Sequence, residues 1–240
     1  RIVPAVVMGV MHSRMNVSAD QFFRGPAEHP FRRGIDEGGL AFRIDAVDAF
    51  ASGAQDQLVL AFDILKHPLD ALPGGDAAAH VIPASVLAQR DAVWPAAIRA
   101  LAVHDSEPQG LIHSDVHIGN WYRTGAGKMG LCDWQCLARG HWTRDFSYAV
   151  TAALTPDDRR NWEKDLLRRY LDRFAGLTGT RPDFDQSFLH YRQQMVHALL
   201  MWTITLCHSP LLPAMQSEQT TLAMIERIST AMADLDSLRS

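Results

Sequence analysis

Hydrophobic and polar positions divide the chain into an early part with strand-like periodicity and a late part with helical periodicity. Two apolar runs, at 40–50 and 57–65, read as strands joined by the turn-like ASGAQD. From 84 to 104 large apolar residues recur at spacings of seven, four and three, which predicts a helix. These residues are Leu87, Trp94, Ile98 and Leu101.

The middle of the chain returns to short strands, and the end is helical. Three short strands are expected, at 110–113, 120–123 and 129–134. Three helices are expected after them, at 160–176, 187–209 and 217–238. The first has a continuous apolar stripe and Gly176 as its stop. Strands followed by helices predict an α+β fold rather than alternating βαβ units.

Composition and charge exclude several classes of partner. A net charge of -4 without a basic face argues against nucleic acid. Three cysteines without paired spacing fit a reducing, cytoplasmic setting better than a disulfide framework. The most apolar stretch, 195–206, is too short to span a membrane. The chain is therefore expected to act on a small molecule, with no nucleic acid and no membrane as partner, and the sequence leaves the oligomeric state open.

The stretch HSDVHIGN contains the candidate chemistry. His113, Asp115 and His117 alternate, so on a strand they would share one face and could bind zinc or iron as in a metal-dependent hydrolase. Gly119 and Asn120 directly after them favour a loop instead. The metal triad remains the less favoured of two interpretations.

The second interpretation is phosphoryl transfer. That reaction needs an aspartate to accept the proton of the attacking hydroxyl and oxygen ligands to hold Mg²⁺ at the phosphates. Asp115 is followed by four residues and then Asn120, and Asp133 ends the next apolar strand as LCDWQ. A hairpin between the two segments would bring Asp133 back beside Asp115 and Asn120.

HSDVHIGN and LCDWQ resemble the catalytic region of the aminoglycoside phosphotransferase and choline kinase superfamily, and the glutamine after Asp-Trp is similar to the ecdysteroid-kinase-like branch. RGHWTRDFSYAV resembles the superfamily's next segment. The resemblance implies that Asp115 is the catalytic base and that Asn120 and Asp133 are Mg²⁺ ligands. It also implies that His113, His117 and Asp145 support the loop.

The same resemblance implies a protein-kinase-like fold with ATP as co-substrate. Residues 66–240 would form a helical C-lobe that carries the catalytic β-hairpin and the magnesium-binding loops. Residues 1–65 would be a short or truncated N-lobe ending in the hinge that meets adenine. The hinge residues would be Phe62, Asp63 and Ile64.

The N-terminal part departs from the superfamily pattern. No lysine precedes Lys66, and no glycine-rich phosphate loop occurs. Two hypotheses follow: a small-molecule kinase that transfers the ATP γ-phosphate to an alcohol group, or a catalytically inactive kinase-like binding module. Relatives with similar loops phosphorylate aminoglycosides, choline-like amines, sugars, macrolides and steroid-like alcohols, so the acceptor and the choice between ATP and GTP stay open.

Aromatic residues on the helix expected at 187–209 could line an acceptor pocket. The candidates are His190, Tyr191 and Trp202. A core helix with satisfied polar groups is the favoured alternative, because aromatic stripes usually pack.

Overall fold

The computed structural model describes residues 77–106, 108–206 and 216–240. The expectations for residues 1–65, including the hinge at Phe62, Asp63 and Ile64, lie outside this part of the chain. The helices are α4 (Ala84–Leu87), α5 (Val93–His104), α6 (Thr143–Ala153), α7 (Pro156–Thr178), α8 (Phe184–Leu206) and α9 (Glu218–Asp234). The short 3-10 turns are η3 (Arg90–Ala92), η4 (Ile118–Asn120), η5 (Trp134–Cys136) and η6 (Ser237–Arg239).

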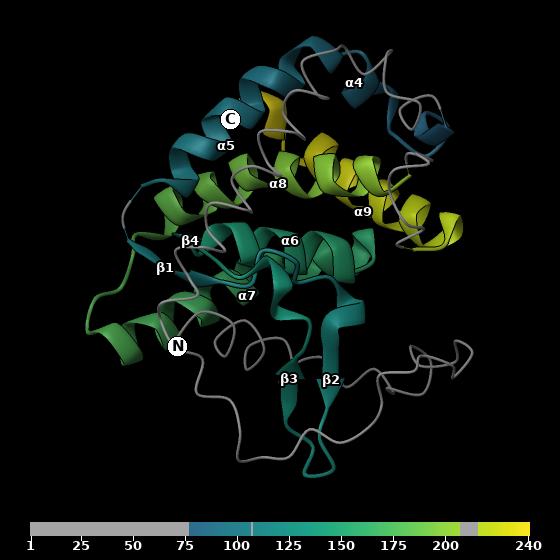
Figure 1. The fold of residues 1–240 in the computed structure, drawn as a ribbon. Coiled ribbons are helices and arrows are strands. Elements are labelled where there is room, and N and C mark those ends of the chain that lie inside the picture. Colours follow the sequence, from purple (N-terminus) through teal and green to yellow (C-terminus); the bar gives the residue numbers. More distant parts are fainter. Residues whose placement is uncertain (1–76, 107, 207–215) are drawn as a thin grey trace.

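Helix α8 is the centre of the packing. It contacts α5, α6, α7 and α9, and Figure 1 shows it running between α5 and α6. Tyr191, Met195, Val196 and Ala198 are completely buried along it. None of the helices in the described ranges is long and apolar enough to cross a membrane.

Helix α7 confirms the stripe read from the sequence but has different ends. Leu166, Leu167, Tyr170, Leu171 and Phe174 are buried, and Trp162 is partly buried against the core. The helix starts at Pro156, because the Thr155 side chain caps it by accepting from the Asp158 amide at 3.2 Å. It continues through Gly176 to Thr178, and Gly179 caps it with a φ of 78°, the left-handed conformation that glycine adopts without strain.

The single helix expected at 84–104 is wrong in two respects. It is divided into α4, η3 and α5. Pro95, near the start of α5, has no backbone N–H to donate to the preceding turn, so a continuous helix is interrupted there. Half of the buried residues of α5 are alanines (Ala96, Ala97 and Ala100), whereas Ile98 is 47% exposed. Small side chains let α5 approach α8 closely, and Gln194 Nε2 donates to the Ala100 carbonyl at 2.6 Å.

Two small antiparallel sheets complete the fold. Strands β2 (Trp121–Arg123) and β3 (Met129–Leu131) form a hairpin that projects from the helices in Figure 1. Strand β1 (Gln109–Ile112) pairs with β4 (Ala138–His141), which the sequence analysis missed. The described residues are thus mostly helical with small antiparallel sheets, which agrees with the expected α+β class.

A buried ion pair joins three of the helices. Arg159 NH1 of α7 lies 2.7 Å from Glu163 Oε2, and the same guanidinium contacts Asp234 of α9. Tyr191 of α8 donates its hydroxyl to Glu163 at 2.9 Å. Arg159 is 1% exposed and Glu163 is 5% exposed, so neither charge can turn to water for hydration. Such a network contributes mainly by leaving no buried charge uncompensated.

Replacing Glu163 with alanine should lower the free energy of unfolding by about 3 kcal/mol, because it removes one partner of a buried guanidinium. Urea unfolding followed by circular dichroism measures this loss. Asp172→Ala is the matched control, since it breaks the exposed pair with Arg181 and should cost less than about 0.5 kcal/mol. Equal losses in the two variants would contradict the assignment.

Candidate active site

The loop after β1 is fixed by a single carboxylate from α6. Asp145 Oδ2 accepts the His113 amide at 2.6 Å, and Oδ1 accepts the Ser114 amide at 2.9 Å. Asp145 is completely buried and lies in the first turn of α6, where free N–H groups favour negative charge. Ser114 has a φ of 66°, a left-handed conformation that costs a residue with a side chain about 1 kcal/mol or more. The two bonds from Asp145 hold the backbone in that turn.

The pKa of the Asp145 carboxyl is raised overall, because burial outweighs the groups that stabilise its charge. Burial raises the pKa of its carboxyl, while the two backbone N–H groups act in the opposite direction, as does Arg144 beside it. The two hydrogen bonds place Asp145 where it can support the loop, and that role stays a prediction.

His113 bridges the loop to the end of the hairpin. Its Nε2 lies 2.9 Å from the Cys132 carbonyl, and its Nδ1 accepts the Asp115 amide at 3.3 Å. These bonds assign the ring proton to Nε2 and occupy both nitrogens. The Trp134 ring covers the imidazole with 4.7 Å between centroids. His113 is therefore placed to brace the loop and has no nitrogen left for a metal.

Asn120 holds Asp115 from the other end of the loop. Its Nδ2 donates to the Asp115 carbonyl at 2.8 Å and to Asp115 Oδ2 at 3.1 Å. Asn120 is 6% exposed and closes the short turn η4 before β2. Because the amide nitrogen is used by Asp115, the amide oxygen of Asn120 is the group that can take a cation.

Asp133 comes to the same place through the hairpin. The Cys132 amide donates to the Asn120 carbonyl at 2.9 Å, so the residue after Cys132 lies at the end of the loop. Asp133 is exposed and its side chain makes no capping bond to η5. Burial raises the pKa of the Cys136 thiol to about 11, and the nearby negative charges of Asp115 and Asp133 add to this rise. The structure thus places Asp133 at the same end of the loop as Asn120, which in turn holds Asp115.

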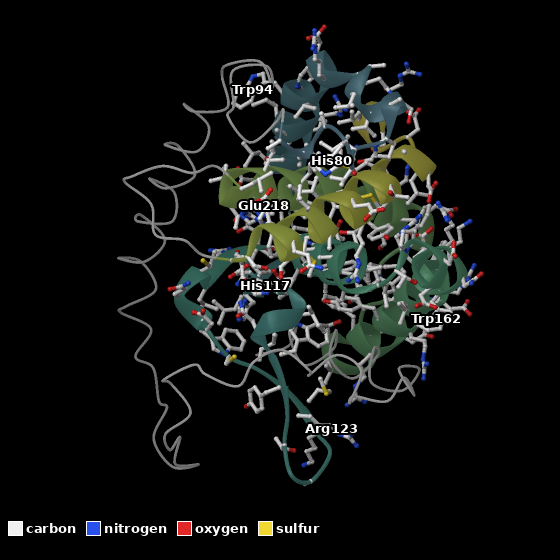
Figure 2. All side chains as sticks on the ribbon, turned by 90° about the vertical axis from the view of Figure 1, so that its right-hand side faces the viewer. His80, Trp94, His117, Arg123, Trp162 and Glu218 are labelled. Carbon is white, nitrogen blue, oxygen red and sulfur yellow. The ribbon has the colours of Figure 1, made fainter. Side chains whose placement is uncertain are left out.

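His117 caps the short turn η4 within the loop. Its Nδ1 accepts the Gly119 amide at 3.1 Å, which caps η4, and its Nε2 lies 3.6 Å from Asp115 Oδ2. Burial lowers the pKa of the imidazole, while Asp115 opposes that change. Figure 2 shows His117 where the hairpin leaves the helices, with Arg123 further out on the hairpin.

The geometry does not favour the metal triad of His113, Asp115 and His117. Both nitrogens of His113 and one of His117 are bonded to the protein, as described above. Within the described ranges, no group of three or more His, Cys, Asp or Glu side chains is arranged to hold a metal ion.

The three residues considered for an acceptor pocket do not converge. Tyr191 is completely buried in the core and donates to Glu163, so of the two alternatives left by the sequence it takes the favoured core position and lines no pocket. His190 lies beside His141, with 5.1 Å between ring centroids, and Gln186. Trp202 lies edge-on to His117 at 5.5 Å. His190 and Trp202 are twelve positions apart, about 18 Å along α8, and of the three residues only Trp202 contacts the loop.

Several residues near the loop were missed by sequence reasoning. Arg144 is buried, 3.3 Å from both ring nitrogens of His104 and 3.0 Å from His197 Nδ1. Burial, and then Arg144, lower the pKa of His104 to about 3, so the ring is neutral beside the guanidinium. A Cβ at Gly140 would lie 2.0 Å from His104 Cε1, which explains the glycine. The contacts of Arg144 with His104 and His197 could not be predicted from sequence spacing, because these residues lie far apart in the chain.

Tyr148 is the missed residue closest to the chemistry. Its hydroxyl donates to Asp115 Oδ1 at 3.2 Å. It lies three residues after Asp145, so both point to the same side of α6. That spacing is a signal that could have placed Tyr148 at the loop once Asp145 was assigned.

The chain matches a known protein family over the region of this site. The model of the phosphotransferase enzyme family matches residues 42–182, more than half of the chain, and the matched range contains the loop, the hairpin and α6. The chain therefore belongs to this family, in the aminoglycoside phosphotransferase and choline kinase superfamily, and the resemblance seen in the sequence is confirmed. Comparisons with curated proteins and with solved structures give no match. The ecdysteroid-kinase-like branch stays a prediction.

Asp145→Asn should loosen the loop while keeping the shape of the side chain. The new amide points an N–H₂ group at one of the two backbone donors, and a hydrogen bond to a charged group is lost. Amide exchange at His113 and Ser114, followed by mass spectrometry or NMR, should become roughly tenfold faster or more. Asp172→Asn on the exposed surface is the control, and unchanged exchange in Asp145→Asn would contradict the role assigned to this carboxylate.

Proposed function

We propose that the protein transfers the γ-phosphoryl group of ATP or GTP to a hydroxyl group of a small molecule. Membership of the phosphotransferase family supports the reaction class. The observation that carries the proposal is the pairing of Asp115 with Asn120 by two hydrogen bonds, with Asp133 brought to the same loop end by the hairpin. These are the parts that phosphoryl transfer requires.

Asp115 is the base of the proposed reaction. The acceptor hydroxyl gives its proton to the Asp115 carboxylate as its oxygen forms a bond to the γ-phosphorus. The bond from that phosphorus to the bridging oxygen breaks, and the nucleoside diphosphate leaves with the electron pair. The side chain is partly exposed, so an acceptor can reach it.

The amide oxygen of Asn120 and the carboxylate of Asp133 would hold the cation. An all-oxygen donor set with one exposed carboxylate and one amide suits Mg²⁺, which keeps several waters and takes few protein ligands. Bound there, Mg²⁺ would neutralise charge on the transferred phosphate. Asp133 has a left-handed backbone with a φ of 59°, which sets the direction of its side chain after β3.

The second hypothesis is a kinase-like module that binds partners without catalysis. It is motivated by the absence of a lysine before Lys66 in the sequence. The complete set of Asp115, Asn120 and Asp133 favours the enzyme, because a binding module has no chemical need for all three. A metal-dependent hydrolase is disfavoured by the bonded nitrogens of His113.

Asp115→Asn should reduce phosphoryl transfer roughly 10²- to 10⁴-fold, because the amide cannot accept the proton. The assay measures nucleoside diphosphate released from Mg-ATP or Mg-GTP by the full-length protein with a panel of aminoglycosides, choline, sugars, macrolides and sterols, and with water alone. Asp172→Asn controls for the loss of one surface charge. Turnover in Asp115→Asn equal to that of the unaltered protein would overturn the mechanism.

Mg-ATP should raise the melting temperature of the full-length protein, since a ligand that binds only the folded state stabilises it by mass action. At a hundredfold excess over Kd the stabilisation is about 2.7 kcal/mol. Removing the cation with EDTA or introducing Asp133→Asn should shrink the shift, and Asp172→Asn should not. No shift at millimolar Mg-ATP would instead favour the binding module.

A further inference from the structure

Helix α6 reaches the loop with two side chains, of which only Asp145 was expected to do so. Asp145 holds the backbone of His113 and Ser114, and Tyr148, one turn later, donates to the side chain of Asp115 at 3.2 Å. The helix therefore fixes both the path of the loop and the side chain that the loop presents.

The Asp115 carboxylate is held at both of its oxygens. Tyr148 binds Oδ1, and Asn120 binds Oδ2 at 3.1 Å. The terminal torsion of an aspartate is broad, so a carboxylate held at one oxygen can still turn about that contact. With both contacts in place, a rotation would break two hydrogen bonds together. The plane of the carboxylate, and so the direction of its remaining lone pairs, is thereby set.

Tyr148 is suited to act as a fixed donor. It is 3% exposed, and its ring lies edge-on to His197 at 6.5 Å. Burial raises the pKa of the phenol well above its usual value, and Asp115 raises it further, with the Trp202 side chain acting in the opposite direction. The hydroxyl thus keeps its proton at any working pH and can donate it to the carboxylate.

We propose that Tyr148 is a positioning residue for phosphoryl transfer, which orients the Asp115 carboxylate toward the acceptor hydroxyl by binding its Oδ1. This inference rests on the proposed function of Asp115 as the base. Tyr148 is 3% exposed and its hydroxyl is bonded to Asp115. Its effect on the rate passes through Asp115 alone.

Tyr148→Phe removes the hydroxyl and leaves the buried ring. The freed carboxylate can turn away from the productive direction, and misplacement of a reacting group is costly. We expect kcat to fall roughly tenfold to a hundredfold, with KM for the nucleotide unchanged. The rate is measured with the best acceptor of the panel above, or with water if none exceeds it.

Ser147→Ala is the matched control on the same helix. It also deletes a buried hydroxyl, which donates to the Tyr191 carbonyl at 3.0 Å and not to the loop. If Tyr148 only stabilised α6 and did not position Asp115, both variants would lower kcat equally. That result would overturn the proposal. A kcat for Tyr148→Phe within twofold of the unaltered protein would overturn it as well.

The double variant Tyr148→Phe with Asp115→Asn tests whether Tyr148 affects the rate only through Asp115. If Tyr148 acts through Asp115, it should have no further effect on the residual rate once the base is gone. Equal fold-losses in both backgrounds would contradict the proposal.

A double-mutant cycle on the free energy of unfolding tests the hydrogen bond between Tyr148 and Asp115 without an activity assay. Tyr148→Phe and Asp115→Ala should change the free energy of unfolding non-additively if the bond forms in solution. An unaltered protein that shows no turnover would refute the proposed function, whereas additive stability changes would refute the inference about Tyr148 itself.

Discussion

The candidate site depends on one interaction, the acceptance of two consecutive backbone amides by the carboxylate of Asp145. Without it the loop would lack the force that keeps Ser114 at a φ of 66° and turns the chain sharply after β1. The cost of that turn, about 1 kcal/mol or more, is offset by two charge-assisted hydrogen bonds of about 1.5–3 kcal/mol each. The path of the loop is thus fixed by α6, whose buried face contacts α8.

Each candidate side chain is then held by a different element. Asn120 fixes Asp115 from the end of the loop, His113 ties the loop to the hairpin through the Cys132 carbonyl, and the hairpin returns the chain to Asp133. Apolar packing of α8 and the buried network around Glu163 hold the helices in place relative to one another, and these helices support the loop and the hairpin. The proposed chemistry depends on few atoms, but their arrangement requires most of the described fold.

The sequence predicted the parts of this site that depend on local spacing. Asp115, Asn120 and Asp133 could be found because loop and hairpin lengths determine where they meet, and the apolar stripe of α7 could be found from its period. Contacts between distant segments had no such signal. The Tyr148 hydroxyl on Asp115, the Arg144 guanidinium between His104 and His197, and the alanine face of α5 follow from tertiary packing. The sequence left Tyr191 open between a core and a pocket, with the core favoured, because an aromatic side chain in an apolar helix looks the same in both.

The measurement that tests the central claim most directly is a crystal structure of the full-length protein with Mn²⁺ and a non-hydrolysable ATP analogue, in which anomalous scattering locates the cation. The account predicts the cation at coordination distance from the amide oxygen of Asn120 and the carboxylate of Asp133, with the terminal phosphate facing Asp115. A cation bound by His113 and His117, or a nucleotide bound away from this loop, would contradict it.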